Sequence, residues 1–65
     1  MQRYFIDEVN GQEMTISGED HHHISRVMRM KTDSELICVT PDGQAALCRI
    51  AEITSDKTMA TVIKW

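Results

Sequence analysis

The 65-residue sequence lacks the features that mark several common functional classes. No apolar run is long enough to cross a membrane, and no signal-peptide core follows Met1, so we expect a cytoplasmic protein with no membrane partner. The two cysteines form no CxxC pair, which excludes a zinc ribbon. The three glycines stand singly, and the chain has no glycine-rich phosphate loop, nucleophile elbow or paired-carboxylate spacing. By itself the chain is therefore typical of a binding module, without catalytic residues.

Length and composition indicate one small globular domain covering residues 1–65. Apolar residues make up 42% of the chain and charged residues 26%, which is ordinary for a folded domain. A chain of this length buries only a modest core. Cys38 and Cys48 are expected to be reduced core residues, because nothing in the sequence directs the chain to an oxidising compartment.

Hydrophobic patterning and turn residues predict several short strands around one helix. The expected strands are residues 2–7, 13–16, 35–40, 44–54 and 58–65, with turns at 10–11, 41–43 and 55–57. Ser17 is a candidate N-cap, with Asp20 where a capping box places an acid, for a helix over about residues 19–30. The most economical way to bury this much sheet is a small, strongly bent β-barrel of about five to six strands, with the helix plugging one side.

Helical periodicity predicts which side of this helix faces the core. Ile24, Val27 and Met28 recur at the i, i+3, i+4 spacing of one buried stripe. His21 is expected beside this stripe, near Ile24. The stripe therefore predicts an amphipathic helix that is held against the barrel.

The opposite face of the predicted helix carries an imidazole and two guanidinium groups. His22, Arg26 and Arg29 follow each other at one-turn spacing, and no acidic residue interrupts residues 21–31. Residues 1–20, by contrast, carry one basic and five acidic side chains. Although the net charge is −3, local charge decides where an anion docks. Two arginines one turn apart suit phosphate contacts, and an imidazole ring can stack on an unpaired base.

Three alternative interpretations of the histidine-rich segment remain open. A metal site is disfavoured, because three consecutive helical histidines point in three directions and cannot converge on one ion. An ordinary solvated helix face would explain the arginines without any ligand. A histidine-based pH sensor would change binding or stability between about pH 5 and pH 7.

The amino end sets a cation beside two aromatic side chains. Strand alternation puts Arg3 and Phe5 on one face and Tyr4 on the other. Tyr4 and Phe5 are both expected to be core residues, and Arg3 is a weaker candidate for contact with nucleic acid. Trp65 is expected to lie in the core or at a domain interface.

Residues 1–5 (MQRYF) and 16–31 (ISGEDHHHISRVMRMK) resemble the amino-terminal PUA-like domain of the bacterial 16S rRNA uridine N3-methyltransferases. That family has an Arg-aromatic-Phe strand, then a pattern like G-E-D-x-H-H-[apolar]-x-R-V-L-R-x-K and a Gly-Asp turn. His22 and His23 match the histidine pair, and residues 26–29 match R-V-L-R with Met28 in place of leucine. Residues 32–35 depart from the pattern, which usually has a glycine before Asp-Glu, so the loop after the helix is expected to differ.

The resemblance implies an RNA-binding domain of a larger enzyme. A separate carboxy-terminal domain of SPOUT type would bind S-adenosylmethionine, form the homodimer and methylate a uridine N3 of 16S rRNA in the small ribosomal subunit. The 65 residues would then be the amino-terminal fragment, with no cofactor site of their own. The residues expected to bind RNA are His22, Arg26, Arg29, Arg3, His23 and Lys31. The alternative is a stand-alone barrel that serves only protein interaction or dimerisation.

Overall fold

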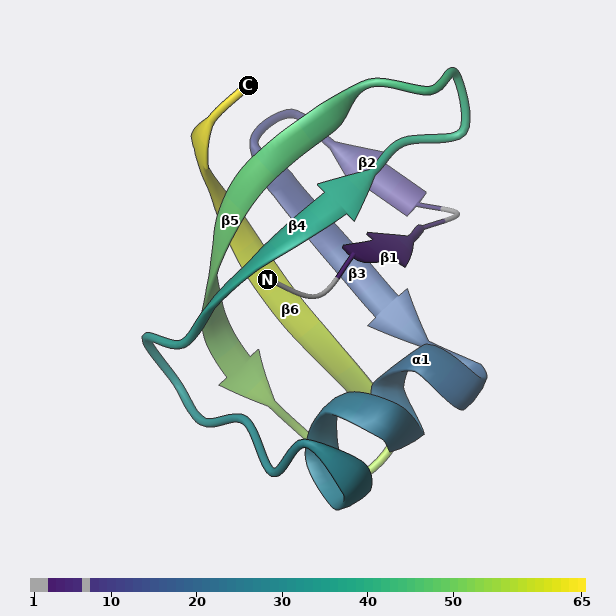
Figure 1. Ribbon diagram of the computed structural model, residues 1–65, viewed down its shortest axis with the longest axis vertical. Coiled ribbons are helices and arrows are strands. Elements are labelled where there is room, and N and C mark those ends of the chain that lie inside the picture. The colour runs from purple at the N-terminus through teal and green to yellow at the C-terminus, as the bar shows by residue number, and fades with distance from the viewer. Residues whose placement is uncertain (1–2, 7) are drawn as a thin grey trace.

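The computed structural model describes residues 3–6 and 8–65, which form one six-stranded sheet and one helical segment (Figure 1). The strands are β1 (Arg3–Phe5), β2 (Glu8–Asn10), β3 (Glu13–Ser17), β4 (Glu35–Val39), β5 (Ala45–Ile53) and β6 (Lys57–Lys64). The helical segment begins as α1 (Gly18–His22) and continues as a π-helical stretch, η1 (His23–Val27). The prediction of a mostly-β, barrel-like domain with a single helix is confirmed. No helix in the described part is long and apolar enough to cross a membrane.

The order of the strands forces the sheet to curl. It runs β1-β4-β5-β6-β3-β2, so the first two strands of the chain lie at opposite edges. Yet only two residues separate Phe5, the end of β1, from Glu8, the start of β2. Three Cα–Cα steps span at most about 11 Å, so the two edges must come close together. Figure 1 shows β1 and β2 near each other across the curled sheet.

Inward-facing side chains of every strand except β2 form the hydrophobic core, together with Ile6, which follows β1, and one apolar side chain from the helical segment. The most completely buried side chains are Met14, Ile16, Ile24, Leu36, Ile50, Thr58, Cys38 and Cys48. Both cysteines are free, as predicted, and the Cys48 thiol lies 3.7 Å from the sulfur of Met14. Ile24 is wholly buried, and it brings the helical segment onto the core.

The strand predictions agree with the structure from β3 onward to within one or two residues. Of the first predicted strand, residues 3–5 are confirmed, while Gln2 and Asp7 lie outside the described residues. Strand β2 was missed, because it is only three residues long, has a single apolar residue, Val9, and buries none of its side chains. Phe5 is a correction: its side chain is 73% exposed, whereas Tyr4 is buried as predicted. The predicted alternation of side chains along this strand is correct. However, β1 is an edge strand, and nothing in the described chain covers its outer face, where Phe5 lies.

The helix prediction over residues 19–30 was wrong at its carboxyl end. Helical structure stops at Val27, and the Met28 amide donates to the carbonyl of His23 at 2.8 Å, five residues back. The Ser25 hydroxyl donates to the carbonyl of His21 at 3.0 Å, the acceptor that an α-helix assigns to the Ser25 amide. The Ser25 hydroxyl thus uses a carbonyl group that the backbone amide would use in an α-helix. At this point the helical turn is wider, and the following residues are shifted out of α-helical phase.

The buried stripe consequently differs from the predicted one. Val27 is 62% exposed and Met28 is 42% exposed, so neither joins Ile24 in the core. Instead Met30 packs against the core, and its amide donates to the carbonyl of Ile24 at 2.9 Å. His21, one turn before Ile24, is buried as expected.

The segment that follows the helix contains two residues in left-handed backbone conformations. Arg29 has φ +52° and Asp33 has φ +73°. The Asp33 amide donates to the carbonyl of Ile50 at 2.8 Å, which ties this turn to β5. Asp33 is one of residues 32–35, which replace the glycine-containing turn of the resembling family, and its positive φ is the conformation that glycine adopts without steric cost.

Substitutions in the helical segment distinguish the observed packing from the predicted stripe. Ile24→Ala removes a wholly buried side chain and is expected to lower the free energy of unfolding by about 2–5 kcal/mol. Val27→Ala, at an exposed position, is expected to change it by at most about 0.5 kcal/mol. Urea titration monitored by circular dichroism measures both. Equal losses would contradict the observed packing.

The buried thiols are expected to make the fold sensitive to alkali. Burial raises the pKa of both Cys38 and Cys48, and at Cys38 the neighbouring thiol adds to the effect. Thiols of the unfolded chain ionise near pH 8.5, so their contribution to stability is complete below that pH and is lost above it. The free energy of unfolding should fall between about pH 8.5 and 10, by at most about 1.4 kcal/mol per pH unit for each thiol. A Cys38→Ala/Cys48→Ala variant should show a flatter pH dependence over this window.

Candidate nucleic-acid interface

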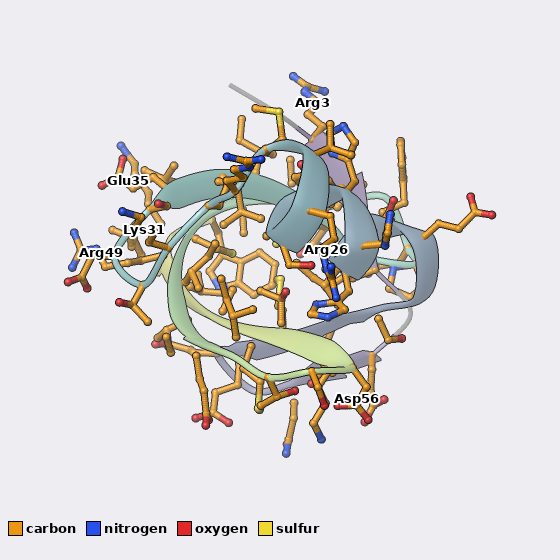
Figure 2. All side chains as sticks on the ribbon, turned by 90° about the horizontal axis from the view of Figure 1, so that it is seen from below. Arg3, Arg26, Lys31, Glu35, Arg49 and Asp56 are labelled. Atoms are coloured by element: carbon orange, nitrogen blue, oxygen red, sulfur yellow. The ribbon has the colours of Figure 1, made fainter. Side chains whose placement is uncertain are left out.

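Basic side chains gather at the end of the barrel that carries the helical segment. Figure 2, seen from this end, shows Arg26 over the helix, Arg3 at one side and Lys31 at another. Arg3, Arg26, Arg29 and Lys31 are all exposed. Within residues 3–6 and 8–65, none of these four forms an ion pair, and the one ion pair found joins Arg49 to Glu35 at 3.6 Å. The four cations are therefore available to an external anion as far as the described chain is concerned.

The three consecutive histidines have three different environments. His21 is 7% exposed, and its Nδ1 lies 2.8 Å from the hydroxyl oxygen of the buried Thr58 on β6. His23 is half-buried, and its Nδ1 lies 2.9 Å from the hydroxyl oxygen of Tyr4 on β1. His22, between them, is exposed. Two of the histidines thus attach the helical segment to the sheet, and one faces solvent.

The hydrogen bond between Tyr4 and His23 joins the edge strand to the start of η1. The two rings are tilted by 54°, with centroids 5.8 Å apart. Burial raises the pKa of Tyr4, and the negative charge of Asp20 raises it further. The phenol consequently keeps its proton throughout the neutral range.

The structure does not reproduce the predicted single face of His22, Arg26 and Arg29. His22 ends α1 and Arg26 lies in η1, whereas Arg29 follows the helix in a left-handed conformation. The one-turn spacing on which the grouping rested assumed a continuous α-helix through residue 30. All three side chains are exposed at this end of the fold, but regular helix geometry does not align them.

Lys31 lies at the flank where the helical segment meets β5. Its amide donates to the hydroxyl of Ser34 at 3.1 Å, and the Ile50 amide donates to the carbonyl of Ser34 at 2.9 Å. In Figure 2 the Lys31 side chain lies near the pair formed by Glu35 and Arg49. In the same view Arg3, on β1, lies at a different side of this end from Lys31.

This end of the fold suits anion binding better than metal binding. No group of three or more metal-ligating side chains comes together in the part of the chain that the structure describes. Exposed guanidinium and ammonium groups bind phosphate, and an exposed imidazole adds a hydrogen bond or a stacking surface. Analysis of the sequence missed the contact of Tyr4 with His23, since the two residues are 19 positions apart and no local spacing links them.

Comparison with known families decides what kind of domain this is. A sequence profile described as "RNA methyltransferase PUA domain" matches residues 16–63, which is most of the chain. The chain belongs to this family. The matched range includes the helical segment and strands β4, β5 and almost all of β6.

Known relatives are several times longer than this chain. Ribosomal RNA small subunit methyltransferase E of Bacillus subtilis is 40% identical over 70 aligned positions, which cover the whole chain but 27% of that protein. An RNA methyltransferase of Thermotoga maritima, described as predicted, superposes with a TM-score of 0.86 at 17% identity, over 98% of this chain and 29% of its own. A third relative is the ribosomal RNA small subunit methyltransferase E of Neisseria gonorrhoeae, whose structure holds S-adenosyl methionine. It superposes with a TM-score of 0.73 at 17% identity, over 98% of this chain and 27% of its own. The two structural matches establish the shared fold alone.

Substitutions in the histidine triplet separate its structural members from its exposed one. His21→Ala leaves the buried Thr58 hydroxyl without its partner and is expected to lower the free energy of unfolding by about 1–3 kcal/mol. His22→Ala, at an exposed position, should stay within about 0.5 kcal/mol of the wild type. Thermal unfolding of both variants tests this difference. Equal effects would show that the triplet is not divided in this way.

Proposed function

We propose that this PUA-family domain binds small-subunit (16S) rRNA and positions it for methylation. The observation that carries the proposal is the set of exposed cations, without carboxylate partners in the described chain, at the helix-bearing end. Membership of a family of RNA methyltransferase domains supports RNA as the anion that this end binds. Contacts to phosphate supply most of the affinity of such a surface, and its imidazole groups add contacts to bases.

Each predicted residue then has a role that its position supports. Arg26 and Arg29 contact phosphates, and Lys31 extends the phosphate track along the flank that adjoins β5. Arg3 does the same on the side of β1. His22, exposed on α1, stacks on or donates to an unpaired base, and His23 presents its outer edge to the RNA.

The activity of the whole protein is a further part of the proposal. The chain spans about a quarter of the length of its relatives. We infer that a carboxy-terminal SPOUT-type domain binds S-adenosylmethionine, forms the homodimer and transfers a methyl group to the N3 of a uridine in the cytoplasm. The B. subtilis relative, a small-subunit rRNA methyltransferase, supports this inference. These 65 residues contribute RNA binding and no cofactor site.

A second candidate function is protein interaction at the end of the barrel opposite the helix. Trp65, Val9 and Ile63 are exposed there, and Phe5, which pairs with Val39 beside the β4–β5 turn, is exposed as well. Val9 and Trp65 line an open hollow of about 300 Å³ together with residues 40–42 and Gln44. Exposed apolar side chains gathered in this way are typical of a docking surface, for the inferred carboxy-terminal domain or for a second copy.

The dependence of RNA affinity on salt tests the proposed function. An Arg26→Ala/Arg29→Ala variant, titrated against a fluorescently labelled small-subunit rRNA transcript, should lose two phosphate contacts. The slope of log K against log salt should therefore become shallower by about 1.4–1.8 units. Lys64→Ala is the matched control, since Lys64 is exposed near the end of β6 that lies away from the helix.

The control should leave the slope unchanged. An unchanged slope in the double arginine variant, with its circular dichroism spectrum intact, would contradict the assignment of this surface. Absence of RNA binding by the wild type, together with concentration-dependent dimerisation in sedimentation, would favour the interaction module instead.

A further inference from the structure

The hydrogen bond between Tyr4 and His23 attaches an imidazole ring of the candidate RNA-binding surface to a residue of the hydrophobic core. Tyr4 is 3% exposed and belongs to the hydrophobic core. Its hydroxyl reaches Nδ1 of His23 at 2.9 Å, at the residue where the π-helical stretch begins. One nitrogen of the ring is thus held from inside the fold.

The position of the proton in this hydrogen bond follows from the surroundings of Tyr4. Within the described residues, the Tyr4 hydroxyl has no other hydrogen-bond partner. If Nδ1 of His23 donated instead, the buried hydroxyl proton would lack an acceptor, which costs about 1–3 kcal/mol. Since the pKa of Tyr4 is raised by burial and by Asp20, the phenol also retains its proton. The hydroxyl therefore donates, and Nδ1 accepts.

The other nitrogen of the His23 ring reaches solvent. Nε2 of His23 has no hydrogen-bond partner among the described residues. In the same part of the chain, no side-chain nitrogen or oxygen is both sealed from solvent and without a partner. Because His23 is only half-buried, Nε2 is the atom that can meet a ligand.

We propose that Tyr4 is a positioning residue for RNA binding, which holds His23 as the neutral Nε2–H tautomer and so presents one outward hydrogen-bond donor to an acceptor atom of the RNA. The inference rests on the proposed RNA-binding function. A neutral imidazole whose Nδ1 accepts must carry its proton on Nε2, so the outer nitrogen donates and does not accept. The acceptor it meets is a phosphate oxygen, a 2′-hydroxyl oxygen or a base carbonyl.

The neighbouring histidines show what this contact adds. His22 is exposed and has no partner within the described chain, so nothing there selects its tautomer. His21 is attached through Nδ1 to Thr58, but that ring is 7% exposed and serves the core. His23 alone among the three combines a fixed inner nitrogen with a half-buried ring at the basic end. Because the Nε2–H donor of His23 is already fixed before RNA binds, binding does not have to order this side chain, and that entropic cost is avoided.

The tautomer is measured first, without RNA. Long-range ¹H–¹⁵N spectra of the imidazole groups at pH 8 should show His23 of the wild-type chain with Nδ1 unprotonated and Nε2 protonated. In the Tyr4→Phe variant, which keeps the ring and loses the hydroxyl, the two nitrogen signals should move toward averaged positions. The matched control is Thr58→Val, which removes the partner of His21 and should leave the His23 signals unchanged.

RNA affinity is measured next in a double-mutant cycle with the same rRNA transcript. Tyr4→Phe should weaken binding roughly two- to tenfold, as expected for loss of one positioned hydrogen bond. His23→Ala should weaken it at least as much, and adding Tyr4→Phe to His23→Ala should have no further effect. Circular dichroism of each variant verifies the fold.

The outcomes separate this inference from the proposed function. If the wild type binds RNA but Tyr4→Phe binds equally well, or if His23 of the wild type carries its proton on Nδ1, the positioning role is overturned and RNA binding stands. If Tyr4→Phe weakens binding equally with and without His23, Tyr4 acts through the fold, and the inference is likewise wrong. If the wild type binds no RNA, the proposed function fails first.

Discussion

The short connection between β1 and β2 constrains the whole fold. Strands β1 and β2 follow each other directly in the chain but occupy opposite edges of the sheet, so the sheet must curl until those edges approach. Curling creates an inside, which the alternate side chains of the strands fill, and an open end, which the helical segment covers with Ile24. Tyr4 lies on the edge strand that is drawn against the helical segment, and so it can reach His23. The contact of the basic end with β1 thus depends on the curling of the sheet.

Much of this fold was predictable because its signals are local. Alternation in residues 35–40 and 44–54, and the turn at Pro41–Gly43, predicted strands that the structure places within one or two residues. Side-chain periodicity likewise predicted that Ile24 and His21 are buried. Strand β2 could not be found in this way, since its pairing with β3 leaves all three of its side chains exposed. An edge strand without a buried face has no hydrophobic pattern to detect.

The candidate site was less predictable than the fold for two physical reasons. Its residues were chosen from one-turn spacing in a segment without acidic residues and from the resemblance. Their arrangement was inferred from an α-helix that does not continue past residue 22. The contact of Tyr4 with His23 depends on how β1 packs against the helical segment, which no pattern along the chain records. Contacts of this kind between residues distant in sequence arise from the curling of the sheet, so they can be found only in the folded molecule.

The π-helical stretch has a consequence for how such domains can vary. A turn closed between His23 and Met28 holds one residue more than an α-helical turn, so the segment is equivalent to an α-helix with a single inserted residue. A related chain that lacked that residue could keep its counterpart of Ile24 in the core and form an ordinary helix. Its basic side chains would then be displayed at different angles around the helix axis. Insertion or deletion of one residue in η1 would therefore change the directions of the anion-binding side chains, while the sheet beneath them stayed the same.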